Sequence, residues 1–363
     1  MALCSSKCPL EAWTKRQNVY IILGAMIVGM RKGATPEEIN GVVEKAKSLG
    51  LGTQLNLGTD KTVVALLGSN TGQLPTDIFA LLPGVESVAR IMKPYKLASR
   101  EFKSQDSVVS INGIEIGGKH IVVMAGPCAV ENEDQLKEAV RAVKKGGACI
   151  VRGGAFKPRT SPFSFQGLEK AGLELLARAR EQFNIPVVTE VVDPHDVSLV
   201  SKYADILQVG ARNMQNFALL TEIGKSKHPV LLKRGFSCTV AEWLTAADYL
   251  LAEGNSQLIL CERGIRTFET SARFSLDVCS IPVIKRFSHL PLIVDPSHAA
   301  GHYALVPAIA KAAIAAGADG LLIEVHPNPK EALIDGLQSL TPSDFARLMK
   351  ELRPIAKSVG RYI

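Results

Sequence analysis

Eight short apolar runs, rich in Val, Ile and Leu, recur along residues 119–363, and stretches of helical pattern separate them. The runs are HIVVMAG (120–126), ACIVRGG (148–154), IPVVTEVV (185–192), DILQVGAR (205–212), PVLLKRG (229–235), QLILCERG (257–264), LPLIVDPSH (290–298) and DGLLIEVHP (319–327). Continuous apolar strands alternating with helices are typical of a parallel sheet covered by helices. Eight such units predict a closed (β/α)₈ TIM barrel, an α/β fold. The alternative, a doubly wound open sheet, is disfavoured because no G-x-G-x-x-G follows the first strand.

Residues 26–95 predict a small domain of the ferredoxin-like βαββαβ type in front of this barrel. An apolar strand at 19–30 leads to a helix that Thr35 can cap and in which Pro36 takes the first position. The remaining elements are strands at 52–58 and 61–68 joined by Thr59-Asp60, a helix at 77–82 and a strand at 85–92.

The segments that flank the small domain are less informative. Residues 1–25 are an extension of unknown role, and residues 96–118 are predicted to be a linker with a β-hairpin at Asn112-Gly113. The run TKRQNVYIILGAMIVGM (14–30) has the basic flank of a signal peptide, but no cleavage site follows, and the run is too short to span a bilayer. We therefore predict a strand there and no association with a membrane.

Composition narrows the class of partner. The formal net charge of +7 favours acidic partners, but the basic residues are scattered and aromatic residues make up only 6% of the chain, which argues against nucleic acid. Small anionic substrates are the better fit. The seven cysteines are an odd number without compact spacing, as expected of reduced thiols in a cytoplasmic protein.

Polar residues appear where each predicted barrel strand ends. In chain order they are Cys128, Arg152, Glu190, Arg212, Lys233, Arg263, His298 (after Asp295) and Glu324. One polar residue at a strand end is usually a cap or a turn former. The carboxyl ends of barrel strands, however, meet at one rim, where active sites of this fold are built. Eight such residues in succession therefore predict an active site.

Cations make up one part of this set. Arg152, Arg212, Lys233 and Arg263 are joined by Lys157 and Arg159 of AFKPRTSPFS (155–164), where prolines favour an extended loop and Thr160 adds a hydroxyl donor. Guanidinium groups suit bidentate binding of phosphate and carboxylate. So many like charges on one rim would repel one another without an anion. We therefore predict a substrate with more than one acidic group.

Cys128, His298 and Glu324 form a second part, and Asp335 is left open as a fourth member. Thiolate, imidazole and carboxylate can together hold a divalent metal ion such as Mn²⁺, Fe²⁺, Co²⁺ or Zn²⁺. Taken alone, Cys128 could be a small buried apolar residue, and His298 could be a helix cap. His302 and His326 are weaker candidates for metal ligands.

The motifs around these residues resemble the 3-deoxy-7-phosphoheptulonate (DAHP) synthase family, in its type I-beta branch with an N-terminal ferredoxin-like regulatory domain. The matching stretches are AGPCAVE, RGGAFKPRTSPFSFQGL, QVGARNMQNF, LLKRGF, CERGIRTFE, VDPSHAAG and EVHPNPKEALIDGLQSL. They span the predicted barrel, and residues 26–95 are similar to the regulatory domain.

The resemblance implies a transferase that acts in aromatic amino acid biosynthesis by an aldol-like condensation of phosphoenolpyruvate with erythrose 4-phosphate. It implies metal ligands at Cys128, His298, Glu324 and Asp335, and a catalytic role for Lys157 with Cys128 and His298. Phosphoenolpyruvate is expected against five cations, and erythrose 4-phosphate against two residues of the KPRT segment. The five cations are Arg152, Lys157, Arg212, Lys233 and Arg263, and the two residues are Arg159 and Thr160. No nicotinamide or pyridoxal cofactor is expected.

Two alternatives stay open. The octulosonate 8-phosphate synthases share the barrel and use arabinose 5-phosphate, but they carry a KANRS-like segment where this chain has KPRTS (157–161). A non-catalytic binding protein is the second alternative, disfavoured by the intact set of candidate ligands. The resemblance also implies feedback by tyrosine or phenylalanine and a homotetramer.

Overall fold

The computed structural model describes residues 25–57, 62–68, 71, 74–91, 93–158, 161 and 163–363. The chain divides into two compact units between Pro94 and Tyr95. The predicted Thr59-Asp60 connection, the start of the first predicted strand and nearly all of the extension 1–25 lie outside the described residues. Among the described helices, none combines the length and the hydropathy needed to cross a membrane.

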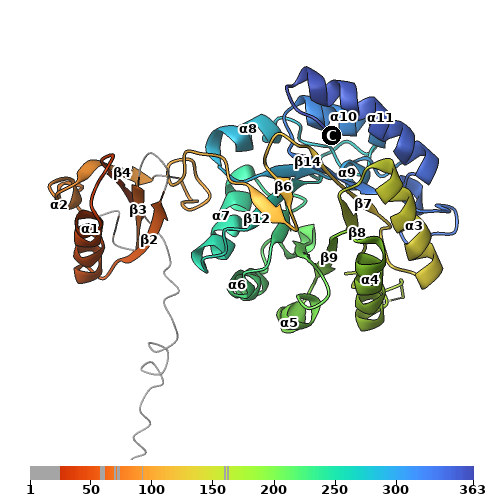
Figure 1. The fold of residues 1–363 in the computed structure, drawn as a ribbon, viewed down its shortest axis with the longest axis horizontal. Coiled ribbons are helices and arrows are strands. Elements are labelled where there is room, and N and C mark those ends of the chain that lie inside the picture. Colours follow the sequence, from red (N-terminus) through yellow and green to blue (C-terminus); the bar gives the residue numbers. More distant parts are fainter. Residues whose placement is uncertain are drawn as a thin grey trace, which may run out of the picture. The chain divides into compact units, whose positions relative to one another are not determined.

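The smaller unit has the predicted βαββαβ order (Figure 1). Its elements are β1 (Ala25–Met30), α1 (Pro36–Ser48), β2 (Gly52–Leu57), β3 (Thr62–Leu67), α2 (Asp77–Ala80) and β4 (Val85–Ile91). The strands form an antiparallel sheet in the order β2-β3-β1-β4. The ferredoxin-like prediction is confirmed, and so is the helix start, because Thr35 and Glu38 form a reciprocal capping box.

Alternate residues of the two central strands supply the core of this unit. Met26 and Val28 of β1 and Leu66 of β3 pack with Val42 of α1 and Phe79 of α2. The helices therefore cover one face of the sheet, as the period-2 pattern of the strands requires.

The larger unit is the predicted closed barrel. Its parallel strands are β7 (Val122–Gly126), β8 (Ile150–Arg152), β9 (Val187–Val191), β10 (Ile206–Val209), β11 (Val230–Lys233), β12 (Leu258–Glu262), β13 (Leu292–Val294) and β14 (Gly320–Glu324). Neighbours in sequence pair in space, and β14 pairs with β7 to close the ring. Each strand matches one of the eight apolar runs, so the barrel prediction is confirmed.

Helices surround these strands (Figure 1). They are α3 (Glu133–Gly146), α4 (Glu169–Phe183), α5 (Val197–Val200), α6 (Phe217–Ser226), α7 (Val240–Ala252), α8 (Ser280–Phe287), α10 (Val306–Ala315) and α11 (Pro342–Ser358). Two short pieces matter for the site: α9 (Pro296–Ala300) follows β13, and the 3₁₀ turn η4 (Gly336–Gln338) lies between β14 and α11.

A β-hairpin covers the amino-terminal end of the barrel. β5 (Val109–Ile111) and β6 (Ile114–Ile116) are joined by Asn112 and Gly113, whose φ angles of 49° and 84° are those of the predicted tight turn. Val109, Ile111 and Ile116 pack with interior residues such as Ile150 and Ile206, which begin their strands. The hairpin therefore lies opposite the end where the strands finish.

The segment before the hairpin packs within the larger unit, where a linker was predicted. Asp248 of α7 accepts hydrogen bonds from the backbone N–H groups of Lys96 (2.5 Å) and Ala98 (2.8 Å). Tyr95 and Leu97 are buried. The backbone of this connecting segment is thus bound to α7. No sequence pattern reveals this contact.

Candidate functional site

The carboxyl ends of the barrel strands surround a cavity of about 270 Å³. Nine of the residues named above line it: Cys128, Arg152, Lys157, Glu190, Arg212, Lys233, Arg263, His298 and Asp335. Glu324, at the end of β14, is buried beside them. The structure therefore brings the predicted strand-end residues to one place.

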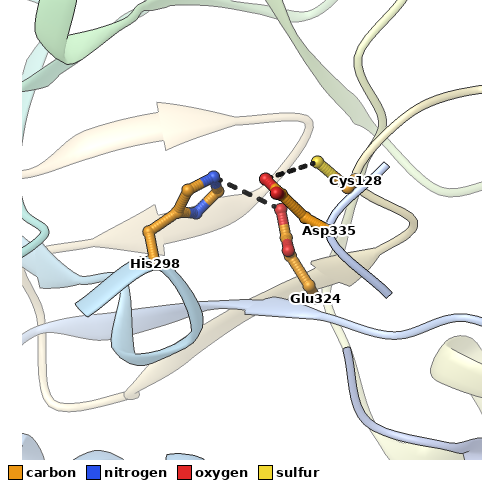
Figure 2. A group of neighbouring side chains, drawn as sticks. All are labelled: Cys128, His298, Glu324 and Asp335. Carbon is orange, nitrogen blue, oxygen red and sulfur yellow. Dashed lines mark hydrogen bonds and ion pairs between the residues drawn. The ribbon is translucent and has the colours of Figure 1, made fainter. Parts of the chain in front are cut away.

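Four potential metal ligands converge there (Figure 2). Each of Cys128, His298, Glu324 and Asp335 offers one ligand atom, and these atoms all lie within 4.8 Å of one another. Cys128 Sγ is 3.7 Å from Asp335 Oδ2, and His298 Nε2 is 3.4 Å from Glu324 Oε1. A thiol, an imidazole and two carboxylates are a donor set that suits first-row transition metals, so the residues fit the predicted ion.

Four local structures deliver these side chains. Cys128 follows β7, His298 lies in α9, Glu324 ends β14, and Asp335 caps η4. Asp335 has a left-handed backbone with φ 54°. A Cβ on the next residue, Gly336, would lie 2.1 Å from the carbonyl oxygen of Pro329, so only glycine fits the turn that follows.

The imidazole of His298 is fixed by a buried relay. Its Nδ1 lies 2.7 Å from Oδ2 of Asp295, and Lys233 Nζ lies 2.6 Å from the same oxygen. A carboxylate only accepts, so Nδ1 carries the proton and Nε2 is left with a lone pair toward the site. Burial lowers the pKa of His298 despite the Asp295 charge. Burial also raises the pKa of Asp295, but His298 and Lys233 outweigh it and hold that pKa well below its usual range.

Charge interactions shift the pKa values of the other two buried candidate ligands, Glu324 and Cys128, in opposite directions. Burial favours protonated Glu324, but the neighbouring His298 and Arg152 outweigh it and lower the pKa of Glu324 to about 2. Burial and the Glu324 charge raise the pKa of the Cys128 thiol to about 12, although Lys157 Nζ lies 3.2 Å from Sγ and opposes the shift. Cys128 must lose this proton to ligate a cation.

Two buried guanidinium groups carry unused donors. Within the described part of the chain, Nε of Arg152 and Nη1 of Arg263 are the buried side-chain nitrogens without a hydrogen-bond partner. Cζ of Arg263 lies 4.0 Å from the ring centre of Phe274 and 4.8 Å from that of Phe236. Burial lowers the pKa of Arg263 to about 10, so it stays charged at neutral pH. Unpaired buried donors at a cavity indicate a site for an anion.

The cations of the site repel one another less than the sequence predicts, because several of them are paired with carboxylates. Arg152 Nη1 is 2.7 Å from Glu324 Oε1, Lys233 is paired with Asp295, and Arg273 Nη1 is 3.3 Å from Asp335 Oδ1. Carboxylates therefore balance part of the positive charge before any ligand arrives. The sequence could not show these pairs, because their members come from different strands and loops.

The remaining sequence predictions have different outcomes. Arg159 and Thr160 lie outside the described residues, while Ser161 and Ser164 of the same segment line the cavity. His326 contacts Glu131 at 3.4 Å, and neither it nor His302 belongs to the group of candidate ligands.

Several residues of the site were missed by sequence reasoning. Gln208, Phe236, Arg273 and Phe274 line the cavity, and Gln338 donates to Glu324. Gln208 is inside a strand, and the others are in loops or turns, where no spacing rule applies. A search confined to the last residue of each strand could not select them.

The sequence pattern of the DAHP synthetase I family matches residues 99–358, and that of the DAHP synthase ferredoxin-like domain matches residues 26–93. A phospho-2-dehydro-3-deoxyheptonate aldolase of Thermotoga maritima is 46% identical over 92% of this chain and 99% of that protein. A 2-dehydro-3-deoxyphosphooctonate aldolase of Francisella tularensis is 32% identical over 69% of this chain and 98% of that protein.

Solved structures show the same likeness. The crystal structure of DAHP synthase from Thermotoga maritima has a TM-score of 0.74 and 45% identity, covering 93% of this chain and 99% of that one. A truncated form of the Thermotoga maritima enzyme has a TM-score of 0.69 and 43% identity, covering 74% of this chain and 99% of that one.

Proposed function

The chain belongs to the DAHP synthetase I family, and we propose that it condenses phosphoenolpyruvate with erythrose 4-phosphate, the first step of aromatic amino acid biosynthesis. One observation carries this proposal. A group of sulfur, nitrogen and oxygen atoms that can ligate a metal lies in the same cavity as buried guanidinium groups whose N–H donors have no partner. Such a cavity suits two phosphorylated substrates, one of which carries an aldehyde.

The reaction forms one carbon–carbon bond and one carbon–oxygen bond, the latter from water, and breaks the carbon–oxygen bond to the phosphate of phosphoenolpyruvate. C3 of phosphoenolpyruvate attacks the aldehyde carbon, water adds at C2, and phosphate leaves with C–O cleavage. Cys128, His298, Glu324 and Asp335 would hold a divalent ion, which would supply Lewis acidity toward the aldehyde oxygen. Mn²⁺, Fe²⁺, Co²⁺ and Zn²⁺ all suit this donor set.

The protein's own residues bind the substrates and move a proton. Arg152, Arg212 and Arg263 bind the anionic groups of phosphoenolpyruvate and set the attack geometry, and Lys233 assists from its pair with Asp295. Lys157 donates a proton to the developing alkoxide, because its ammonium lies next to the ligand group. The KPRT segment, with Arg159 and Thr160, binds the sugar phosphate.

Comparing two aldoses tests the proposal. Phosphate release from phosphoenolpyruvate is expected with erythrose 4-phosphate and not with arabinose 5-phosphate. The KPRTS segment and the matched ferredoxin-like domain favour the four-carbon sugar. Activity with the pentose alone would favour the octulosonate reaction instead.

Cys128→Ser is the matched site variant for this assay. It is expected to lose metal-dependent turnover, because a hydroxyl is a poor replacement for a thiolate ligand. Full activity in this variant would exclude the ligand group as the metal site. Absence of turnover with either aldose in the wild-type protein would favour the binding-protein alternative.

Regulation and assembly extend the proposal. We propose that residues 26–93 bind tyrosine or phenylalanine as a feedback inhibitor, that the protein is a homotetramer, and that it acts in the cytoplasm. The match to the family's ferredoxin-like domain supports the first of these.

A further inference from the structure

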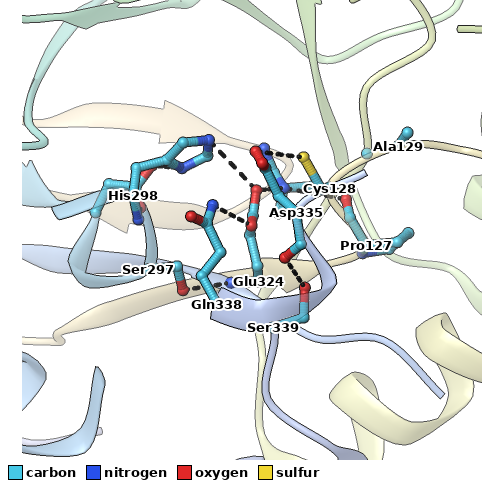
Figure 3. Close-up of polar contacts among 12 residues, drawn as sticks. Pro127, Cys128, Ala129, Ser297, His298, Glu324, Asp335, Gln338 and Ser339 are labelled. Carbon is cyan, nitrogen blue, oxygen red and sulfur yellow. Dashed lines mark hydrogen bonds and ion pairs between the residues drawn. The ribbon is translucent and has the colours of Figure 1, made fainter. Parts of the chain in front are cut away.

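Gln338 lies between two charged groups of the site and is only 2% exposed. Its Oε1 accepts a hydrogen bond from Arg273 Nη1 at 2.7 Å, and its Nε2 donates to Glu324 Oε2 at 2.6 Å. A guanidinium only donates and a carboxylate only accepts, so the two partners fix the orientation of the amide. Figure 3 shows Gln338 pointing at the Glu324 carboxylate from the side of η4.

This contact decides which oxygen of Glu324 faces the other ligands. Oε2 is held by Gln338, whereas Oε1 bonds Arg152 at 2.7 Å and lies 3.4 Å from His298 Nε2. The backbone N–H of Glu324 donates to Ser297 Oγ at 3.0 Å. The carboxylate is therefore held at both oxygens and cannot rotate without breaking a buried bond.

The same turn carries Asp335. Asp335 is the residue directly before η4, and Gln338 is the last residue of η4. Arg273 Nη1 lies 3.3 Å from Asp335 Oδ1, while Oδ2 faces Cys128 Sγ at 3.7 Å. Arg273 thus contacts both Asp335 and Gln338.

Arg273 is itself anchored to the helix that carries His298. Its backbone N–H donates to Ala300 O at 3.3 Å, and that of Phe274 donates to Ala299 O at 3.0 Å. Since α9 spans Pro296–Ala300, Arg273 is held against α9 by its backbone and against η4 by its side chain. Three of the four ligating residues are therefore fixed relative to one another through this arginine.

We propose that Arg273 and Gln338 are positioning residues, which hold the carboxylates of Glu324 and Asp335 in the orientation that binds a divalent cation. The inference rests on the proposed function only in requiring that the four-ligand group binds a metal ion. Outer partners of ligating side chains typically change metal affinity 10- to 100-fold.

Calorimetric titration of the metal-free protein with Mn²⁺, without substrate, tests this. Gln338→Met keeps the length of the side chain and removes both hydrogen bonds, and Arg273→Met removes the guanidinium from a partly exposed position. Each is expected to raise the Kd for Mn²⁺ by about 10- to 100-fold. Because Gln338→Met leaves Glu324 Oε2 without its donor, the melting temperature of that metal-free variant is expected to fall, whereas that of metal-free Arg273→Met should stay near the wild type.

Gln208→Met is the matched control. Gln208 is another buried glutamine of the cavity, but its side chain contacts Glu190 and not a candidate ligand. Its Kd for Mn²⁺ should stay within about twofold of the wild type.

The outcomes separate this inference from the proposed function. An unchanged Kd in both Gln338→Met and Arg273→Met, or an equal rise in Gln208→Met, would overturn the positioning role. If Gln338→Met does not fold, Arg273→Met decides by itself. Wild-type protein that takes up no Mn²⁺ would contradict the metal site, whereas intact binding without turnover would contradict only the proposed reaction.

Discussion

His289 is a buried imidazole outside the group of candidate ligands, and its two nitrogens have different partners. Nε2 lies 2.8 Å from the carbonyl oxygen of Leu97, and Nδ1 lies 2.8 Å from Ser107 Oγ. A carbonyl only accepts, so Nε2 carries the proton and Nδ1 accepts from the hydroxyl. Burial, assisted by the charges of Lys103 and Arg100, lowers the pKa of His289 to about 4 despite the bond to Leu97 and the charge of Asp106.

This residue predicts a loss of stability in mild acid. In the unfolded chain the imidazole has a pKa near 6.5, so between about pH 6.5 and 4 the unfolded state binds a proton that the folded state does not. The free energy of unfolding should therefore fall as pH falls through this window, by about 3 kcal/mol when complete.

His289→Gln provides the measurement. Glutamine can donate and accept like the neutral imidazole but does not titrate. Urea unfolding at a series of pH values should show a shallower decline for the variant than for the wild type. Parallel declines would show that another group is responsible.

The residues of the site differ in how far the sequence could reveal them. Cys128, His298 and Glu324 could be selected because each follows or ends an apolar run, and parallel strands deliver their ends to one rim. Asp335 lies eleven positions beyond Glu324, so chemistry alone left it open. Arg273 and Gln338 could not be selected, because their roles come from contacts between loops.

Among the elements, the β5–β6 hairpin has the clearest structural role. Ile116 is fully buried in the cluster that fills the barrel interior, whereas Ile114 is only partly buried at its margin. Ile116→Ala is expected to lower the free energy of unfolding by about 2–5 kcal/mol, because it leaves a cavity in a packed core.

Ile114→Ala is the matched control and should cost less. KM for both substrates should stay unchanged in Ile116→Ala, because the hairpin covers the end of the barrel opposite the site. Denaturant unfolding and steady-state kinetics on the same preparations measure both. A raised KM with unchanged stability would contradict the assignment of the hairpin to the core.

Elements were predictable where local chemistry specifies them. Thr35 with Glu38 specifies a helix start, and Asn112-Gly113 specifies a tight turn. The helix predicted at 77–82 is shorter, at Asp77–Ala80. The connecting segment at 95–98 was not predicted to pack, because its anchor, Asp248, is some 150 residues away in the chain.

At the scale of the whole molecule, eight repeats of one strand–helix unit were enough to predict a closed ring, and the two compact units correspond to the two matched family patterns. A truncated form of the Thermotoga maritima enzyme has been solved as a structure of its own. Removing the smaller unit of this chain therefore tests whether catalysis and feedback inhibition reside in different units.

Deleting residues 1–94 is expected to leave the condensation reaction and to abolish inhibition by tyrosine or phenylalanine. The cavity is lined by residues of the larger unit, so catalysis should persist. Titration of both proteins with the two amino acids measures the difference. Inhibition that survives the deletion would place the effector site in the barrel instead.

The ring closes where β14 pairs with β7, from Gly320 opposite Val122 to Glu324 opposite Gly126. Cys128 follows one of these strands, and Glu324 ends the other. A cation bound by both residues would link β7, the first strand of the barrel, to β14, the last. It could bind only when these two strands are in register, so its binding would stabilise the pair that closes the barrel. Removal of the metal would then destabilise the β7–β14 pair as well as abolish the reaction.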